Sequence, residues 1–235
     1  MSPDRREFLQ RLTIGSVALG SLPASLSAAE PDTSSLAFSE LVALDQQPAA
    51  PTFDTSWTQK LTGKYKTVFD VPSISGGSGV WRAGMWKYHY RDVLKAEPAD
   101  MCSVIVIRHE AIPLIMNHEF WDAYDVAKAS KVRHPMTDKK TRRNPVLMTA
   151  DDDQLPATFV GYTLPKQMER GAIVLGCNLA FAGMVSMVAK QDNLKNPEAR
   201  AKALSMVVPG VILQPNGIFG VTLAQHNGCA FVTAS

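Results

Sequence analysis

Apolar residues along this chain fall into two alternating patterns. Short continuous runs rich in Val and Ile, which are typical of buried strands, alternate with stretches whose apolar residues recur at helical spacing. The runs that predict strands cover residues 65–71, 102–108, 172–176, 211–214 and 229–233. Helices are predicted between them, over residues 80–95, from about residue 119, over 178–189 and over 217–226.

Strands and helices that alternate with short connections favour an α/β fold. The sequence therefore predicts a mainly parallel sheet of about five strands with helices on both faces. The stretch 178–189 is apolar on nearly every side. A helix of this kind is buried all round, so we expect the core or a second subunit to cover it.

One charged segment, residues 131–154, interrupts the alternation. It is rich in Lys and Arg and ends close to three consecutive aspartates, Asp151, Asp152 and Asp153. A charged stretch of this length is typical of a solvated excursion or lid. The aspartates lack the spacing and the glycine of a calcium loop, so we expect no metal there.

The first 29 residues have the three parts of a secretory signal. Arg5 and Arg6 stand just before an apolar stretch over residues 12–22, and small residues follow at 27–29. The paired arginines indicate twin-arginine export, so a periplasmic or otherwise exported protein is predicted. Residues 30–63 read as an N-terminal arm or linker, and the folded body is expected over residues 64–235.

Composition excludes several classes of protein. The 235 residues carry a formal net charge of only +2, so the broad basic face of a nucleic-acid-binding protein is not expected. Three cysteines are too few for a disulfide scaffold. No apolar run in the mature part approaches a membrane span. Haem-attachment, Walker and dinucleotide-binding motifs are absent from the sequence, and we expect no cofactor.

Function is expected at the carboxyl ends of the strands, where α/β proteins bind ligands. The first predicted helix is preceded there by a loop containing Ser75, Gly76, Gly77 and Ser78. Such a loop directs backbone N–H groups at an anion or serves as a flexible turn. His109 directly follows the second predicted strand, which makes it either a ligand-facing or a structural residue.

Cys177 and Asn178 join the third predicted strand to its helix. A helix N-terminus stabilises a thiolate, so Cys177 is the candidate nucleophile or sulfur carrier, with a small buried apolar residue as the alternative. Cys102 and Cys229 lie near strand starts, at the opposite end of a parallel sheet, and would pair only if their strands were neighbours. A metal site formed by His109, His118 and Cys177 is a weaker hypothesis.

Residues 65–233 resemble the DsrE/DsrF-like (YchN-like) family of sulfur-relay proteins. The segments that carry the resemblance are residues 66–70, 103–113, 171–178, 208–217 and 223–231. The resemblance implies an α/β protein that forms trimers or hexamers and carries sulfur on Cys177. The excursion at 131–154 and the export signal depart from the cytoplasmic members of the family.

Two functional hypotheses follow. In the first, the protein handles sulfur in the periplasm, as a sulfurtransferase-like carrier of sulfane sulfur or of a thiol adduct on Cys177. His109 would then shape the pocket, the Ser73–Gly79 loop would hold an anionic group, and a small sulfur compound or a sulfur-relay protein would be the partner. In the second, the protein is a non-catalytic oligomeric module that binds a small ligand.

Overall fold

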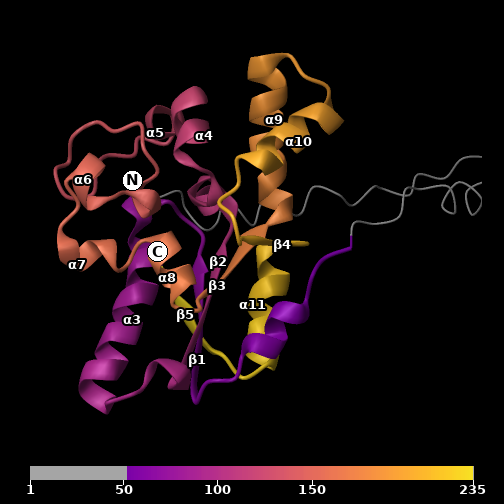
Figure 1. The fold of residues 1–235 in the computed structure, drawn as a ribbon. Helices are drawn as coiled ribbons and strands as arrows, with labels where there is room; N and C mark the ends of the chain where they lie inside the picture. Colours follow the sequence, from indigo (N-terminus) through magenta and orange to yellow (C-terminus); the bar gives the residue numbers. More distant parts are fainter. Residues whose placement is uncertain (1–51, 235) are drawn as a thin grey trace, which may run out of the picture. The chain divides into compact units, whose positions relative to one another are not determined.

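The computed structural model describes residues 52–234, which form a five-stranded sheet with helices around it (Figure 1). All strand pairs are parallel, and the strand order is β4-β3-β2-β1-β5. The strands are β1 (Tyr65–Val71), β2 (Met101–Ile107), β3 (Ile173–Cys177), β4 (Ile212–Gln214) and β5 (Ala230–Thr233). The predicted α/β fold is confirmed. The predicted signal peptide and the arm up to residue 51 lie outside the described residues.

The central strands form because their residues suit a sheet covered on both faces. Every residue of β2 is buried, and five of its seven residues are Val, Ile or Met. β1 is buried from Thr67 to Val71, and all of β3 is buried. The edge strands are less buried than these central strands, and all four residues of β5 are exposed. The interior of the fold is therefore centred on β1, β2 and β3.

The helices divide between the two faces of the sheet. The four longest are α3 (Ser78–Leu94), α9 (Asn178–Asp192), α10 (Asn196–Ser205) and α11 (Gly217–His226). Five shorter ones are α4 (His118–Ala123), α5 (Val126–Ala129), α6 (Ala150–Asp153), α7 (Ala157–Val160) and α8 (Leu164–Glu169). Five 3-10 helices are η1 (Ser56–Lys60), η2 (Ser75–Gly77), η3 (Pro98–Asp100), η4 (His109–Ile115) and η5 (Pro145–Leu147). None of the helices in the described range is long and apolar enough to cross a bilayer.

Strand order explains which helix covers which face. From β1 to β4 the chain steps across the sheet in one direction, and right-handed crossovers put the intervening helices on one face. There α3 and α9 pack with Phe69, Ile105 and Val174. The chain then reverses from β4 to β5. This last crossover puts α11 on the other face, where it packs with Val104 and other buried strand residues.

Three helical predictions need correction. The helix expected from residue 119 is interrupted, because Asp125 adopts a left-handed backbone conformation between α4 and α5. The helix predicted over 178–189 extends to Asp192, and the core of the single chain does not cover it all round, since Leu179 is 73% exposed. α10 was not predicted, because its sequence NPEARAKALS is mostly polar and buries only Ala199 and Ala203.

The folded body begins earlier than the sequence indicates. Residues 52–63, assigned to the arm, belong to the same compact unit as the sheet. Trp57 in η1 is completely buried and packs with Leu61 in the core on the α11 face. Burial of the large Trp57 side chain contributes to holding a segment that is otherwise rich in polar residues against the sheet.

The excursion at 131–154 is not wholly solvated, which corrects the sequence-based expectation. Its first part is mostly exposed, but Asn144 is completely buried. The Asn144 side-chain amide donates hydrogen bonds to the carbonyl oxygens of Leu114 (2.9 Å) and Met116 (2.7 Å). Its backbone N–H donates to Nδ1 of His118 at 3.1 Å. These bonds attach the excursion to the body and compensate for the burial of a polar side chain.

The contact between His118 and Asn144 predicts a dependence of stability on pH. Burial lowers the pKa of His118 from its usual 6.5, and the positive charge of Arg143 adds to this effect. A pKa that is lower in the folded than in the unfolded state gives stability that is present above the unfolded pKa and is lost as pH falls through the folded value. We expect the free energy of unfolding, measured by denaturant titration, to fall between about pH 7 and pH 5.

The control variant is His89→Gln, because His89 is exposed on α3. This variant should keep the pH dependence of the free energy of unfolding, whereas His118→Gln should make that dependence less steep. Equal slopes in the two variants would contradict this role of His118.

Candidate functional site

At the carboxyl end of the sheet the topology defines a switch point between β3 and β4. After β3 the chain enters α9 on one face, and after the neighbouring β4 it enters α11 on the other face. In α/β sheets, ligands bind where neighbouring strands lead to opposite faces, just beyond their carboxyl ends. Cys177 is the last residue of β3 and is paired in register with Gln214 of β4. The candidate nucleophile therefore stands at this switch point.

Cys177 is also the N-cap residue of α9. Its Sγ accepts a hydrogen bond from the backbone N–H of Ala180 at 3.3 Å. The positive end of the helix dipole and this N–H both stabilise negative charge on sulfur. The residue is 5% exposed, so the thiol lies just beneath the surface. This geometry suits a thiolate that a small reagent reaches only after slight opening of the site.

Arg108 supplies a positive charge beside this thiol. Val106 pairs with Leu175 and Ile107 with Gly176, so continued register puts Arg108 alongside Cys177. The guanidinium binds Asp70 through two hydrogen bonds, Nε to Oδ1 at 2.6 Å and Nη2 to Oδ2 at 2.8 Å. The bond to Asp70, with a smaller contribution from the Cys177 sulfur, raises the pKa of Arg108. The Arg–Asp pair thus links β1 to β2 at the carboxyl end of the sheet, next to the strand that carries Cys177.

Neither Asp70 nor Arg108 was singled out from the sequence. The sequence does contain a signal for this pair. Asp70 is a lone carboxylate inside an apolar strand, and Arg108 is an arginine at the end of the next strand. In adjacent parallel strands those two positions come close together. Gln214 was also missed; it is 1% exposed, and its Oε1 has no hydrogen-bond partner among the described residues. Its Nε2 donates to the carbonyl oxygen of Asp54 at 2.7 Å.

The start of α11 depends on Arg108. A Cβ atom at Gly217 would lie 2.5 Å from both Cβ and Cδ of Arg108, so only glycine fits at this position. The ion pair also lies at one side of a hollow of about 370 Å³ on the α11 face, lined by Asp70, Arg108, Ile218, Val221, Gln225 and Phe231. Ile218 is 68% exposed, so this charged pair is bordered by exposed apolar side chains.

The other two cysteines differ from Cys177. Both are buried free thiols near the amino ends of their strands. β1 lies between β2 and β5, so Cys102 and Cys229 are not on neighbouring strands. Burial raises the pKa of Cys102, and it raises the pKa of Cys229 to about 11. Both thiols therefore stay protonated near neutral pH and are poor nucleophiles.

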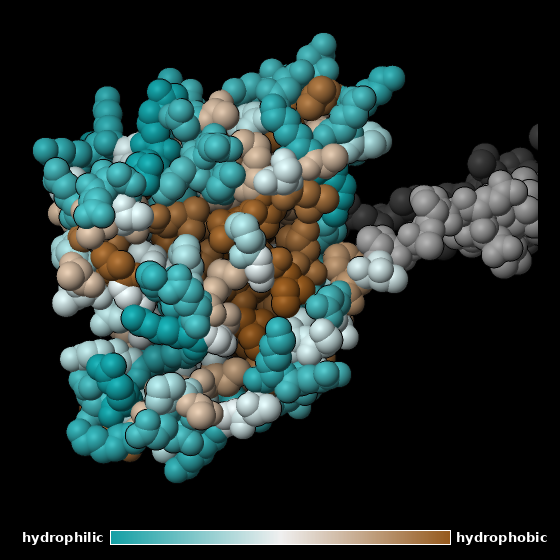
Figure 2. Space-filling view, viewed as in Figure 1, coloured by the Kyte–Doolittle hydropathy of each residue, from teal (hydrophilic) through white to brown (hydrophobic). Residues whose placement is uncertain are grey.

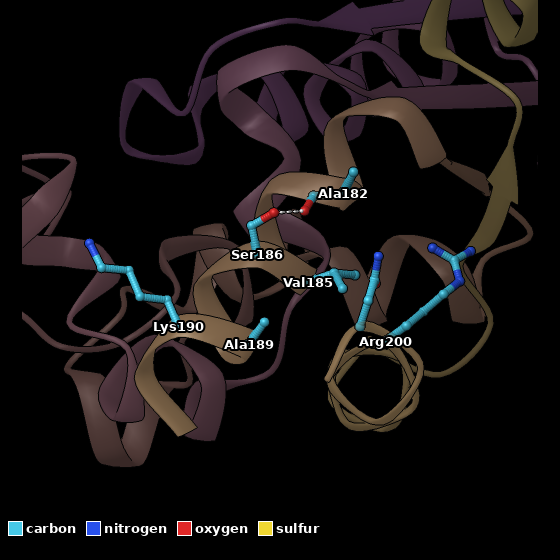
Figure 3. Close-up of a pocket in the computed structure, with 7 residues that line it drawn as sticks. Ala182, Val185, Ser186, Ala189, Lys190 and Arg200 are labelled. Carbon is cyan, nitrogen blue, oxygen red and sulfur yellow. Dashed lines mark hydrogen bonds between the residues drawn. The ribbon is translucent and has the colours of Figure 1, made fainter. Parts of the chain in front are cut away.

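Asn178 connects α9 to α10 rather than opening toward the switch point. Its Oδ1 accepts a hydrogen bond from Nη2 of Arg200 at 2.8 Å. Further along these helices lies a hollow of about 600 Å³, lined by Ala182, Val185, Ser186, Ala189, Lys190, Asn196 and Arg200. Figure 3 shows Ala182, Val185 and Ser186 along α9, with Arg200 reaching from α10. The small side chains leave this space open between the two helices.

His109 stands at the end of β2, as the sequence indicated, but its side chain is exposed. Its backbone φ of 53° lies in the left-handed region, which is uncommon for a residue with a side chain. His118 is bound to Asn144 and to the carbonyl oxygen of Leu147 at 3.2 Å. Within residues 52–234 no cluster of three or more His, Cys, Asp or Glu side chains is arranged to hold a metal ion.

The predicted anion-binding loop lies next to the charged excursion. Ser75, Gly76 and Ser78 line a hollow of about 520 Å³ together with residues 130–135 and Asp138. Ser73, Ser75, Glu110 and Lys131 belong to an adjoining hollow of about 540 Å³. Cys177 lines neither of these two hollows. The structure therefore brings the loop together with Lys131 and Arg133 rather than with the thiol.

Large apolar side chains are exposed at the starts of α9 and α11 and on β5. Figure 2 shows hydrophobic residues gathered in the middle of one face, over the region where Figure 1 draws α9, β4 and α11, with hydrophilic residues around them. The large apolar side chains exposed on the starts of α9 and α11 and on β5 are Leu179, Ile218, Phe219, Phe231 and Val232. Large exposed apolar patches mark interaction sites in soluble proteins.

Comparison with known protein families, with characterised proteins and with solved structures found no match to this chain. The functional argument therefore depends on the residues and their geometry.

The Asp70–Arg108 pair is predicted to stabilise the site and the fold. The Asp70 side chain is 7% exposed and that of Arg108 is 29% exposed. Asp70→Asn leaves a partly buried cation without its counterion, so we expect the free energy of unfolding to fall by about 2–3 kcal/mol. Denaturant titration measures this change.

Asp122→Asn is the matched control. Asp122 and Arg142 are also 2.6 Å apart, but their side chains are 63% and 65% exposed. The free energy of unfolding of the control variant should fall by less than about 0.5 kcal/mol, because solvent screens an exposed ion pair. Similar losses in both variants would show that burial does not strengthen the Asp70–Arg108 pair.

Proposed function

We propose that this chain is a sulfur-handling protein in which Cys177 carries sulfane sulfur or a thiol adduct. The observation that carries the proposal is the position of the Cys177 sulfur at the switch point between β3 and β4, where it accepts the Ala180 N–H. The guanidinium of Arg108 on the next strand adds positive charge. The resemblance of residues 65–233 to sulfur-relay proteins of the DsrE/DsrF-like family gives further support.

The transfer step follows from the chemistry of a thiolate. The Cys177 thiolate attacks the outer sulfur of a donor persulfide, R–S–SH. A bond forms between Cys177 Sγ and that sulfur, while the S–S bond of the donor breaks. The electron pair of the broken bond leaves with the donor as R–S⁻, and Cys177 becomes a persulfide. No external oxidant or reductant is consumed. The helix dipole and the Ala180 N–H favour the ionised thiol that this step requires.

The signal-like residues 1–29 support an exported location for this activity. We infer that the twin-arginine pair Arg5–Arg6 directs the folded protein to the periplasm, where the donor would be a small sulfur compound or a partner protein.

One observation favours a second candidate, a non-catalytic binding module. Cys177 is only 5% exposed, which also suits a small buried apolar residue. In that case the thiol would be unreactive in the folded protein, and the exposed apolar surface would carry the function.

Alkylation kinetics separate these two functions. We expect iodoacetamide to modify Cys177 of the folded protein faster than Cys102 or Cys229, because burial raises the pKa of both other thiols. Incubation with a low-molecular-weight persulfide should then add one sulfur atom to Cys177, detected by mass spectrometry.

Cys177→Ser should abolish both the fast alkylation and the sulfur adduct, and the matched variant Cys229→Ser should keep both. If Cys177 reacts only after denaturation, the carrier function is wrong and the binding module is favoured.

We also propose that the apolar surface formed by Ile218 and β5 is a contact between copies of this chain. Every residue of the edge strand β5 is exposed, and Ile218 stands beside it at the start of α11. Edge strands with free backbone groups pair readily with another chain. An assembly of this kind would cover Phe231 and would narrow access to the Asp70–Arg108 pair.

Sedimentation velocity tests this contact. The protein should sediment as a homo-oligomer, trimer or hexamer, and Ile218→Glu should shift it toward the monomer. Val93→Glu is the control, since Val93 is 75% exposed near the end of α3, at the amino end of the sheet. A monomeric parent protein, or equal dissociation in both variants, would contradict the proposal.

A further inference from the structure

The strand β5 forms one edge of the sheet, and its outer side is uncovered. Among residues 52–234 it pairs only with β1, and all four of its residues are exposed. Phe231 is 46% exposed and Val232 is 38% exposed, although both side chains are large and apolar. The opposite edge differs, because β4 is partly buried and Gln214 donates to the carbonyl oxygen of Asp54. The β5 edge is therefore the one left open for a further strand.

The hydrogen bonds of β5 show which backbone groups face this open edge. The N–H of Ala234 donates to the carbonyl oxygen of Asp70 on β1 at 2.8 Å. Successive residues of an extended strand direct their N–H and C=O groups to opposite edges, so the backbone groups of Val232 also face β1. Phe231 and Thr233 direct theirs away from β1. No other segment of the described range supplies a partner for these four outward groups.

The sequence of β5 lacks the features that keep edge strands apart. Natural edge strands are protected by Lys or other charged residues, by Pro, or by a bulge. β5 consists of Ala, Phe, Val and Thr, and its four residues pair with β1 in unbroken register. An open edge of this composition favours pairing with another strand.

The spacing of the outward groups makes this edge complementary to itself. When two copies of β5 run antiparallel about a two-fold axis at Val232, Phe231 of each copy lies opposite Thr233 of the other. Two residues that face each other in this way exchange both N–H···O=C bonds, so all four outward groups of each strand are satisfied. β5 carries no charged side chain, so two copies meet without repulsion between like charges.

We infer that β5 pairs antiparallel with β5 of a second copy, so that the two sheets become continuous. This inference rests on the contact between copies proposed above, and it assigns the symmetry and the hydrogen bonds of that contact. Phe231 lies on the α11 side of the joint, in register with Val68, and Val232 contacts its own copy on the α3 side, in register with Phe69. A two-fold axis requires an even number of copies, so a hexamer or a dimer is expected rather than a trimer.

Disulfide cross-linking of the full chain tests this register, with diamide as the thiol oxidant. Val232→Cys places two thiols directly opposite each other, in a pair whose Cα atoms are about 4.5 Å apart. A disulfide spans this distance. We expect most of the variant to migrate as a covalent dimer on non-reducing electrophoresis, with the link between the two copies of residue 232 identified by mass spectrometry.

Thr233→Cys is the matched control, because Thr233 is exposed on the same strand. In the inferred register the two copies of residue 233 are offset by two positions, so their Cα atoms are about 8 Å apart, beyond the reach of a disulfide. This variant should give at least about tenfold less covalent dimer. Equal cross-linking in both variants would show random collision and would overturn the register.

A second pair of variants tests the backbone hydrogen bonds. Phe231→Pro removes an outward N–H but no bond to β1, so an edge strand tolerates it. Phe231→Ala also loses the aromatic ring but keeps the N–H. Because the two-fold axis doubles the loss, we expect the dissociation constant from sedimentation equilibrium to be roughly tenfold higher for Phe231→Pro than for Phe231→Ala. Equal dissociation constants would overturn the inference.

The outcomes separate this inference from the proposals that it extends. A monomeric parent protein would overturn both the contact between copies and the strand pairing. An oligomer that Ile218→Glu dissociates, but that does not cross-link through residue 232, would keep the contact and overturn only the strand pairing. The sulfur function is tested apart from both, by alkylation and sulfur loading of Cys177.

Discussion

The guanidinium of Arg108 fixes the geometry on which the carboxyl end of the sheet depends. It joins β2 to β1 through two hydrogen bonds to the buried carboxylate of Asp70. The aliphatic part of the Arg108 side chain lies against Gly217, so α11 approaches the sheet only because that residue has no Cβ. The same charge stands alongside Cys177 on β3. A neutral residue at position 108 would leave Asp70 buried without a counterion, and the effect would reach the helix, the sheet edge and the thiol together.

The strands could be predicted from the sequence because a buried parallel strand leaves a direct trace. Residues such as Val104–Ile107 are apolar on both faces of the pleat and are all β-branched, a combination that favours a buried strand over a helix. The helices were less predictable, because their packing depends on distant contacts. α10 is mostly polar and is a helix largely because α9 covers its Ala199 side. The attachment of the excursion depends on one buried residue, Asn144, whose carbonyl partners lie about thirty positions earlier in the chain.

The candidate site was predictable only in part for the same reason. Cys177 could be found because a thiol between a strand and a helix is a local feature. The pairing of Asp70 with Arg108 is set by strand register, and the position of the Ser75–Ser78 loop beside Lys131 is set by the path of the excursion. Neither arrangement leaves a pattern in the local sequence. The exposure of Leu179 could not be inferred either, because an apolar helix surface looks the same in sequence whether a core or a second subunit covers it.

The 3-10 helix η4 explains why the thiol and the basic hollow are separate. The N–H of Ala111 donates to the carbonyl of Pro72 after β1 at 3.2 Å, and the Ile115 side chain packs over Gly176 of β3. Every residue from Ala111 to Ile115 is buried, so this segment fills the space above β2 where the two loops would otherwise face each other. The buried η4 segment thus fills the centre of this end of the sheet. The two flanks of this end of the sheet hold different features, a thiol where β3 and β4 diverge and a cationic hollow at the start of α3.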